Sequence, residues 1–538
     1  MNKDKEGLIG GILIIGLRNK IEVKESIKVF KKKGKIMAKT VEKYKVFDLE
    51  LSGTSQGNPF QDVQLTADFS NGIQKLTVKG FYKDQGKYGI RFMPQAEGNW
   101  TYETHSSDPQ LDGQTGEFLC TPAAAGNHGR VCLKKDVLPK KEVNFYVTED
   151  EFHFAYEDGT RFQPFGTTCY AWVNQSEQVQ EQTLETLKNA PFNKIRMCIF
   201  PKFYTYNTTD PERYAFQGNA KDGFDFSRFD NVFFENLEKR IQQLDELGIE
   251  ADIILLHPYD RWGFSKMTKE QDIFYLSYAA RRLSHFKNIW WSMANEYDLM
   301  PQKTVEDWDT YARVVMENDP YGHLRSIHNC VPLFDHNRSW ITHVSVQRVD
   351  VYKTAEMVTD WRNQYRKPVI VDEVGYEGNI DFGWGCLTAQ ELTRRFWEGC
   401  MRGGYLSHGE TYVDQGDQIW WAHGGTLHGE STARIAFLKE QMAQLPDDIQ
   451  PLTLTPENHG ENWDSVCLHD GESYFLYYYG FFRPLYRNYT LPAGKKYKIE
   501  LIDTWNMTTE ELPEVYEGKI RIKMGARQYM AVRMKEVK

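Results

Sequence analysis

Two glutamates stand at the ends of short apolar runs, where a carboxyl group could act as an acid, a base or a nucleophile. Glu296 follows Asn295 directly after the run Ile289–Ala294, and Glu373 ends a run that begins at Pro368. Two carboxyl groups that face one another can divide the work of hydrolysis, because one can give a proton while the other attacks. These residues therefore predict a hydrolase with paired glutamates.

The segment that carries both glutamates alternates between β-branched or aromatic runs and amphipathic stretches, which is typical of βα units. One helix is predicted from Phe233, Leu237, Ile241 and Leu244, which recur at helical spacing before Gly248. The strand candidates are Phe162–Thr168, Lys194–Ile199, Asp252–His257, Ile289–Ala294, Arg325–His328, His343–Gln347, Pro368–Asp372 and Gly404–Ser407. Eight such units predict a (β/α)8 TIM barrel, whose active site forms where the strands end. The two glutamates would then close strands four and seven and face one another across the barrel mouth.

Strand-like alternation flanks the barrel on both sides. Before the barrel, short runs in which apolar and polar residues alternate are separated by turn signals such as Asn71-Gly72, at the spacing typical of a β-sandwich. After it, alternation returns in runs such as Tyr497–Ile502. The predicted organisation is a basic N-terminal extension at 1–42, a β-sandwich at 43–145, the barrel at 146–445 and a small β-sandwich at 446–538.

The charge balance restricts the class of ligand. Lysine and arginine number 65 against 75 aspartates and glutamates, so the formal net charge is −10, although the first 45 residues are rich in lysine. An acidic body argues against a nucleic-acid partner and permits a neutral ligand such as a carbohydrate. The 30 tyrosines, 31 phenylalanines and 14 tryptophans suit stacking on sugar rings, and they suit a β-rich core equally well.

The eight cysteines show no CxxC spacing, and several, such as Cys198, lie in apolar runs. This pattern predicts free buried thiols and a reducing, cytoplasmic compartment. The apolar run Leu8–Leu17 is too short to span a membrane. Its lysine-bearing start resembles a signal peptide and leaves secretion open, but no convincing cleavage site follows. We interpret Met37 as the true start of translation.

Further motifs give the chain a resemblance to known families. Asn295-Glu296 and Glu373 resemble the 4/7 superfamily of retaining glycoside hydrolases. Within it the barrel is similar to the apiosidase-like (DUF4038-type) branch, on Phe165-Gly166-Thr167-Thr168 with Trp172, Ile195–Lys202, His343–Gln347 and Gly409-Glu410-Thr411-Tyr412. The N-terminal sandwich resembles an Ig-like module (DUF5060-type), on Asn58–Val63, Gly80-Phe81-Tyr82, Arg91–Pro94 and Gly98–Tyr102. The C-terminal sandwich resembles the DUF5605 type.

The resemblance implies a retaining glycosidase for plant-derived or microbial oligosaccharides that needs no cofactor and no metal. Glu373 would attack the anomeric carbon, while Glu296 would protonate the leaving oxygen and later deprotonate a water. A like charge nearby would keep Glu296 protonated near neutral pH. The chain departs from the branch at Thr167, where aspartate is common, and at Glu410, where histidine is expected, so the sugar stays open.

Other residues at strand ends are predicted to bind the substrate. Arg196, at the end of strand two, would hold Glu373 ionised, and Asn295 would bind the sugar 2-hydroxyl. His343 and Gln347 share one face of strand six, which could point into the barrel mouth. The predicted substrate-binding set is Arg196, His257, Asn295, His343, Gln347, Glu410, Trp172 and Trp420. The two tryptophans would stack on sugar faces.

Two alternatives stay open. His257, His328, His343 and His408 could bind a metal at the barrel mouth, although the paired glutamates would then be coincidental. The barrel could also be a catalytically silent carbohydrate-binding protein, although a decayed site would be expected to lose at least one of its polar residues. The sequence does not fix the linkage, exo or endo action, or the oligomeric state, and a homo-oligomer is open.

Overall fold

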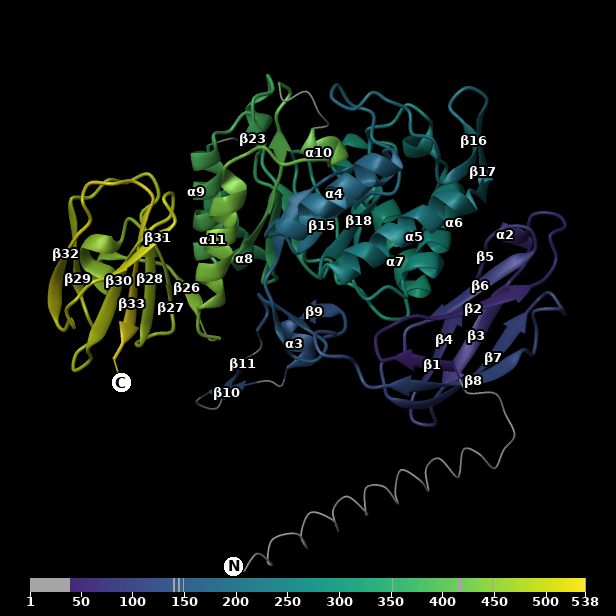
Figure 1. Cartoon of the computed structure of the whole chain (residues 1–538), viewed down its shortest axis with the longest axis horizontal. Helices are drawn as coiled ribbons and strands as arrows, with labels where there is room; N and C mark the ends of the chain where they lie inside the picture. The colour runs from purple at the N-terminus through teal and green to yellow at the C-terminus, as the bar shows by residue number, and fades with distance from the viewer. Residues whose placement is uncertain are drawn as a thin grey trace, which may run out of the picture.

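The computed structural model describes residues 39–138, 141–143, 146–148, 150–350, 352–414, 419–447 and 449–537. A central barrel carries one β-sandwich on each side (Figure 1), which is the predicted fold class. The predictions for the run Leu8–Leu17 and for Met37 lie outside the described residues.

The N-terminal domain consists of two facing sheets, with strand orders β1-β8-β7-β3-β4 and β2-β6-β5. Its inward side chains alternate as expected: Leu65, Ala67 and Phe69 on β3 are buried, and the residues between them are partly exposed. The bounds are β1 Lys39–Glu42, β2 Phe47–Ser52, α2 Pro59–Asp62, β3 Leu65–Ser70, β4 Lys75–Lys79, β5 Phe81–Tyr82, β6 Lys87–Phe92, β7 Gly98–Ser106 and β8 Thr115–Thr121. The sheet includes β1, within the segment that the sequence assigned to an extension, because β1 pairs with β8 in parallel.

A short sheet of order β13-β12-β9 leads from this domain into the barrel. Phe154 of β12 packs on Trp290 and Tyr405, with ring centroids 5.2 and 5.5 Å away, near the amino ends of two barrel strands. The bounds are β9 Val131–Leu133, α3 Lys134–Val137, β10 Lys141–Val143, β11 Tyr146–Thr148, β12 Phe154–Tyr156 and β13 Arg161–Phe162. The connecting sheet therefore covers the end of the barrel opposite the strands' carboxyl ends.

The barrel contains eight parallel strands, ordered β20-β19-β18-β15-β14-β24-β22-β21. The bounds are β14 Phe165–Thr168, β15 Lys194–Cys198, β18 Glu250–Leu256, β19 Ile289–Ala294, β20 Arg325–Ser326, β21 Val344–Gln347, β22 Val369–Glu373 and β24 Tyr405–His408. The fifth and sixth strands, β20 and β21, form no ladder with one another. They are bridged instead by Thr342, whose backbone N–H donates to the carbonyl of Arg325 at 2.9 Å.

Helices cover the outside of the barrel, and α5 shows why they form. Its buried face contains Phe233, Leu237 and Ile241, as the spacing predicted. Asp230 caps its amino end by accepting from two backbone N–H groups, and Gly248 follows its carboxyl end with a left-handed φ of 70°. The helices that cover the barrel are α4 Glu177–Asn189, α5 Asn231–Glu246, α6 Lys269–Leu283, α7 Val305–Asn318, α8 Val358–Tyr365, α9 Ala389–Met401 and α11 Ser431–Ala443. The short helix α10 Trp420–His423 lies at the barrel mouth instead. The described chain between β20 and β21 has no helix.

Shorter elements lie in the loops around the barrel. They are the hairpin β16 Phe216–Asn219 with β17 Gly223–Phe229, the pair β23 Glu377–Gly378 with β25 Glu410–Thr411, and the 3-10 turns Trp172–Asn174, Phe264–Lys266, Tyr297–Leu299, Ala355–Met357 and Gly383–Gly385.

The C-terminal domain pairs a six-stranded sheet, of order β26-β27-β28-β33-β30-β31, with the hairpin β29-β32. The bounds are β26 Gln450–Leu452, α12 Pro456–His459, a 3-10 turn at Gly460–Asn462, β27 Val466–His469, β28 Tyr474–Tyr478, β29 Tyr486–Thr490, β30 Tyr497–Asp503, β31 Thr508–Glu511, β32 Lys519–Lys523 and β33 Met530–Glu536. A core of its own packs between these sheets and includes Tyr497, Ile499 and Val532.

Both outer domains are fastened to the barrel by buried side-chain contacts, which are ionic on one side and aromatic on the other. Arg91 of β6 pairs with Glu238 of α5 at 2.7 Å, and Glu238 pairs in turn with Arg282 of α6 at 2.5 Å. On the other side, Trp397 of α9 stacks on Tyr478 of β28, with ring centroids 5.4 Å apart. Figure 1 shows α9 and α11 between the barrel and the C-terminal domain.

All eight cysteines lie in the described part of the chain, and none forms a disulfide. Five of them are buried, whereas Cys132 and Cys330 are partly exposed and Cys386 is exposed. Across the described ranges, no helix combines the length and apolar character that a membrane crossing requires.

Candidate active site

The two glutamates at the ends of strands four and seven line one cavity of about 370 Å³ at the barrel mouth. Glu296 follows β19 directly, and Glu373 is the last residue of β22. The cavity is lined by Lys202, Tyr204, Tyr259, Glu296, Cys330, Gln347, Arg348, Val349, Glu373, Gly383, Trp384 and Trp421. The barrel therefore brings together the two carboxyl groups that are far apart in the sequence.

Glu296 sits in a tight turn at the end of β19. Its backbone is left-handed, with φ 53° and ψ 57°, a conformation that is uncommon for a residue with a side chain. Two amides hold the carboxyl group: Gln347 Nε2 donates to Oε1 at 2.8 Å, and Asn295 Nδ2 donates to Oε2 at 3.1 Å. Burial raises the pKa of Glu296, and the negative charge of Glu373 raises it further.

Glu373 has the opposite surroundings. The hydroxyl of Tyr170 donates to its Oε1, and the same oxygen lies 3.5 Å from Arg196 Nη1 and 3.5 Å from His328 Nε2. Burial alone would raise the pKa of Glu373, but His328, Arg196 and Lys202 outweigh it and hold the pKa below the usual range for glutamate. The surroundings thus shift the two pKa values in opposite directions and favour the charged form of Glu373 and the protonated form of Glu296.

Arg196 links the two ends of the site. Its Nη1 donates to Asn295 Oδ1 at 2.7 Å and to the Tyr170 hydroxyl at 3.1 Å. Below it, inside the barrel, Asp372 accepts from Lys194 Nζ at 2.9 Å. Both side chains of that pair are fully buried, so Asp372 points into the barrel and away from the cavity.

Lys202 places a positive charge against the cavity wall. Its Nζ lies 3.6 Å from the ring centre of Tyr170, 4.3 Å from that of Tyr259 and 4.5 Å from that of Trp421. Burial lowers the pKa of Lys202, although the charges of Glu296 and Glu373 act against that change. The three aromatic faces stabilise the ammonium group by cation–π interaction.

Three predicted substrate-binding residues belong to this constellation. Gln347 lines the cavity, while Arg196 and Asn295 contact the two glutamates from beneath. The other five lie outside the cavity lining, and their positions differ from expectation.

His343 lies at the opposite end of the barrel, with its ring 5.2 Å from that of Trp290. It shares a face with Gln347, but four residues of strand separate them by about 13 Å, so only one can reach the mouth. Trp172 is buried, with its Nε1 3.4 Å from the sulfur of Met197. Trp420 is buried too, and its Nε1 donates to Thr167 Oγ1 at 2.9 Å.

The neighbour of Trp420 forms the aromatic wall instead. Trp421 lines the cavity, and its ring lies 5.1 Å from that of Trp384. His257 is buried behind the wall, with Nε2 3.2 Å from the carbonyl oxygen of Phe200. Glu410 joins a separate buried cluster with His408.

The sequence did not predict that Lys202 contacts a substrate or a carboxylate, and it indicated His328 only as a possible metal ligand. His328 follows the short strand β20, so its place at a strand end was the available signal. The hydroxyl of Tyr170, for which the sequence predicted no contact with a carboxylate, contacts Glu373. For Lys202 the sequence holds no clear signal, because the loop after β15 decides where its side chain points.

The arrangement can carry out hydrolysis at a saturated carbon. Two carboxyl groups with oppositely shifted pKa values line the same partly enclosed cavity, with aromatic rings on one wall and amides beside Glu296. These groups can supply a nucleophile, a proton donor and a stacking face for a ring-shaped ligand.

Comparisons with known proteins agree with this chemistry. The family model described as the apiosidase-like catalytic domain matches residues 148–474. Two families described as domains of unknown function, DUF5060 and DUF5605, match residues 40–107 and 463–535. No curated protein matches the chain.

Two solved structures from Bacteroides vulgatus ATCC 8482 are similar to the chain. One, a candidate glycoside hydrolase, is 39% identical and has a TM-score of 0.85, with 93% of this chain and 100% of that chain covered. The other, a glycoside hydrolase of family 5, is 17% identical with a TM-score of 0.56, and the match covers 72% of this chain and 92% of that chain. The second likeness concerns the fold alone.

Proposed function

The chain belongs to the apiosidase-like family of glycoside hydrolases, and from this premise we propose that it cleaves oligosaccharides with retention of anomeric configuration. The observation that carries the proposal is the contrast between Glu296 and Glu373, whose surroundings shift their pKa values in opposite directions. Such a contrast assigns the acid and the base in a carboxylate pair.

In the proposed mechanism, Glu373 is the nucleophile. Its charged oxygen attacks the anomeric carbon and forms a covalent glycosyl-enzyme, while the carboxyl proton of Glu296 passes to the leaving oxygen. Glu296, now charged, then takes a proton from a water, and that water releases the sugar and restores Glu373. Attack from opposite faces in the two steps gives the product the configuration of the substrate.

The neighbouring residues receive positioning roles. Tyr170, Arg196 and His328 keep Glu373 ionised by hydrogen bonding and charge. Gln347 fixes the rotamer of Glu296 by its 2.8 Å hydrogen bond. Asn295 is assigned to the sugar 2-hydroxyl, where contacts strengthen in the transition state.

The cavity suits a short substrate. A volume of about 370 Å³ lies near the lower end of the range for small-molecule sites. Trp384 and Trp421 offer aromatic faces on which a sugar ring can stack. We therefore assign exo action on short plant-derived or microbial oligosaccharides to this site.

The proposal is tested with a panel of 4-nitrophenyl glycosides that contains β-xyloside, β-glucoside, β-galactoside, α-arabinofuranoside and β-apioside. Proton NMR of the first product formed from any cleaved glycoside reads the anomeric configuration before mutarotation. Retention is expected. Inversion would remove the nucleophile role from Glu373, and absence of cleavage across the panel and across short oligosaccharides would favour a carbohydrate-binding protein.

A further inference from the structure

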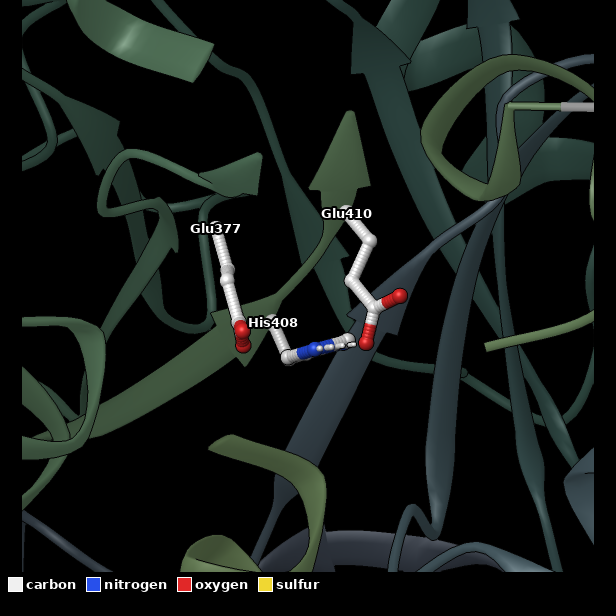
Figure 2. Close-up of side chains that lie close together, drawn as sticks. All are labelled: Glu377, His408 and Glu410. Atoms are coloured by element: carbon white, nitrogen blue, oxygen red, sulfur yellow. Dashed lines mark ion pairs between the residues drawn. The ribbon is translucent and has the colours of Figure 1, made fainter. Parts of the chain in front are cut away.

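A second group of ionisable side chains lies buried beside the eighth barrel strand. It consists of Glu377 on β23, His408 at the end of β24 and Glu410 on β25. Each is at most 1% exposed, and one ligand-type atom from each lies within 4.8 Å of those of the other two. Figure 2 shows that the polar ends of the three side chains converge.

The cluster holds two carboxylates with little positive charge to balance them. Among ion pairs between described residues, Glu377 has no lysine or arginine partner, and Glu410 has only His408, whose Nε2 lies 3.5 Å from Oε1. Two buried carboxylates this close repel one another strongly, because the protein interior screens charge poorly. A cation among them would remove that repulsion.

His408 is oriented as a ligand would be. Its Nδ1 lies 3.3 Å from Thr167 Oγ1, and that oxygen also accepts from Trp420 Nε1 at 2.9 Å. The ring is thereby fixed with Nε2 turned toward the carboxylates (Figure 2). Within the described residues, this fully buried Nε2 has no hydrogen-bond partner. Metal-binding histidines are typically held through their second nitrogen in this way.

The two carboxylates are also held from behind. Glu377 Oε1 accepts from the Tyr412 hydroxyl at 2.8 Å and from the backbone N–H of Glu430 at 2.9 Å. Glu410 Oε2 accepts from the backbone N–H of His428 at 2.7 Å. These contacts fix both groups and leave lone pairs on each carboxylate for a further partner.

We propose that Glu377, His408 and Glu410 bind one divalent transition-metal ion, with Zn²⁺ as the best match. One imidazole and two carboxylates form a ligand set that zinc accepts, whereas Ca²⁺ and Mg²⁺ prefer oxygen ligands alone. Ligand atoms around tetrahedral zinc lie about 3.3 Å apart, so the ligand atoms would draw together by up to about 1.5 Å on binding.

The role of this ion is to fasten three segments. Glu377 lies four residues after Glu373, and His408 ends the eighth strand. The backbone N–H groups that donate to the two carboxylates come from the chain that leads into α11. The bound ion would therefore hold the loop that follows strand seven. This inference is independent of the glycosidase proposal, because it concerns metal binding and not turnover.

The test uses the full chain with any histidine tag removed. Protein stripped with a chelator is dialysed against Zn²⁺ and then against buffer, and bound metal is measured by mass spectrometry. About one zinc per chain is expected, together with a higher melting temperature than that of the stripped protein.

Two variants and one control locate the ion. His408→Gln and Glu410→Gln should weaken zinc binding by about 100-fold or more, since removing even a residue that only supports a ligand costs about 10- to 100-fold. Glu250→Gln is the matched control, because Glu250 is also a buried glutamate, accepts from Trp290 and lies outside the cluster. It should keep one zinc.

If His408→Gln failed to fold, Glu410→Gln would still test the proposal. Cobalt bound to the wild-type chain should give visible absorption bands whose position changes in Glu410→Gln. A wild-type chain that retains no zinc, or variants that retain as much zinc as the wild type, would overturn the proposal.

Discussion

Replacing Tyr170 by phenylalanine removes one hydroxyl and leaves the ring in place. That hydroxyl donates to Glu373 Oε1 and accepts from Arg196 Nη1 at 3.1 Å. A hydrogen bond to a charged group contributes about 1.5–3 kcal/mol. Because about 1.4 kcal/mol corresponds to one pKa unit, the pKa of Glu373 should rise by about 1 to 2. It stays ionised at neutral pH, since Arg196 and His328 remain.

The assay is the pH dependence of kcat/KM on whichever glycoside the wild-type enzyme cleaves best. The acid limb of that profile reports ionisation of the nucleophile in the free enzyme. The limb should therefore move up by about 1 to 2 pH units in Tyr170→Phe, with a smaller change in the plateau.

Tyr275→Phe provides the control, because it removes a buried hydroxyl that donates to the carbonyl of Leu255 at 3.0 Å and contacts neither glutamate. Its acid limb should coincide with that of the wild type. If the limb of Tyr170→Phe also stayed at the wild-type position, the hydroxyl would not stabilise the charged form of Glu373, and the assigned role would be wrong.

Three further predictions follow from the same structure. Glu296→Ala should lower the rate of hydrolysis of glycosides with poor leaving groups by about 10²- to 10⁴-fold, and that of 4-nitrophenyl glycosides far less. Added azide should restore turnover and give a glycosyl azide of retained configuration. Equal losses on both kinds of substrate would contradict a proton-donor role. The pH profile of the wild-type activity should be bell-shaped. Activity should fall at low pH because Glu373, whose pKa is lowered, gains a proton, and at high pH because Glu296, whose pKa is raised, loses one. The profile of Glu296→Gln should therefore lack the fall at high pH. Glu238→Gln leaves Arg91 and Arg282 without their buried carboxylate partner, and it should lower the free energy of unfolding, measured in urea, by about 3–5 kcal/mol. A loss below about 1 kcal/mol would show that these ion pairs contribute little.

The barrel could be predicted from the sequence because several of its strands, such as Glu250–Leu256 and Ile289–Ala294, are mostly apolar runs. Ile289–Ala294 has the same bounds in the structure as in the prediction, and the helix built on Phe233 and Leu237 buries the predicted face. The fifth strand is shorter than predicted, at Arg325–Ser326, because it forms a ladder with β19 alone. Periodicity reports burial, and it does not report where a ladder ends.

The candidate site could be predicted where a residue sits on a strand end, and not where a loop sets its direction. Glu296 and Glu373 line one cavity because the ends of parallel strands meet at the barrel mouth. The choice between Trp420 and Trp421 depends on the orientation of the four-residue helix α10, which no pattern in the sequence specifies. Lys202 reaches its aromatic cage through the loop after β15, and loop conformation is equally hidden from periodicity.

The cluster of Glu377, His408 and Glu410 could not be predicted from the sequence either. The sequence led us to expect no metal and placed Glu410 among the substrate-binding residues. The three side chains come from two neighbouring loops and one strand end, and they meet only because β23 pairs with β25. Such a meeting has no signature in residue spacing.

Covalent trapping tests the central claim most directly. The enzyme is incubated with a 2-deoxy-2-fluoro glycoside of the sugar that it cleaves, digested with a protease and analysed by mass spectrometry. We predict that one fluoro-sugar is attached to the peptide that contains Glu373, through an ester on its side chain. Attachment to any other residue, or complete absence of a covalent adduct in an enzyme that cleaves the parent glycoside, would contradict the assignment of Glu373 as the nucleophile.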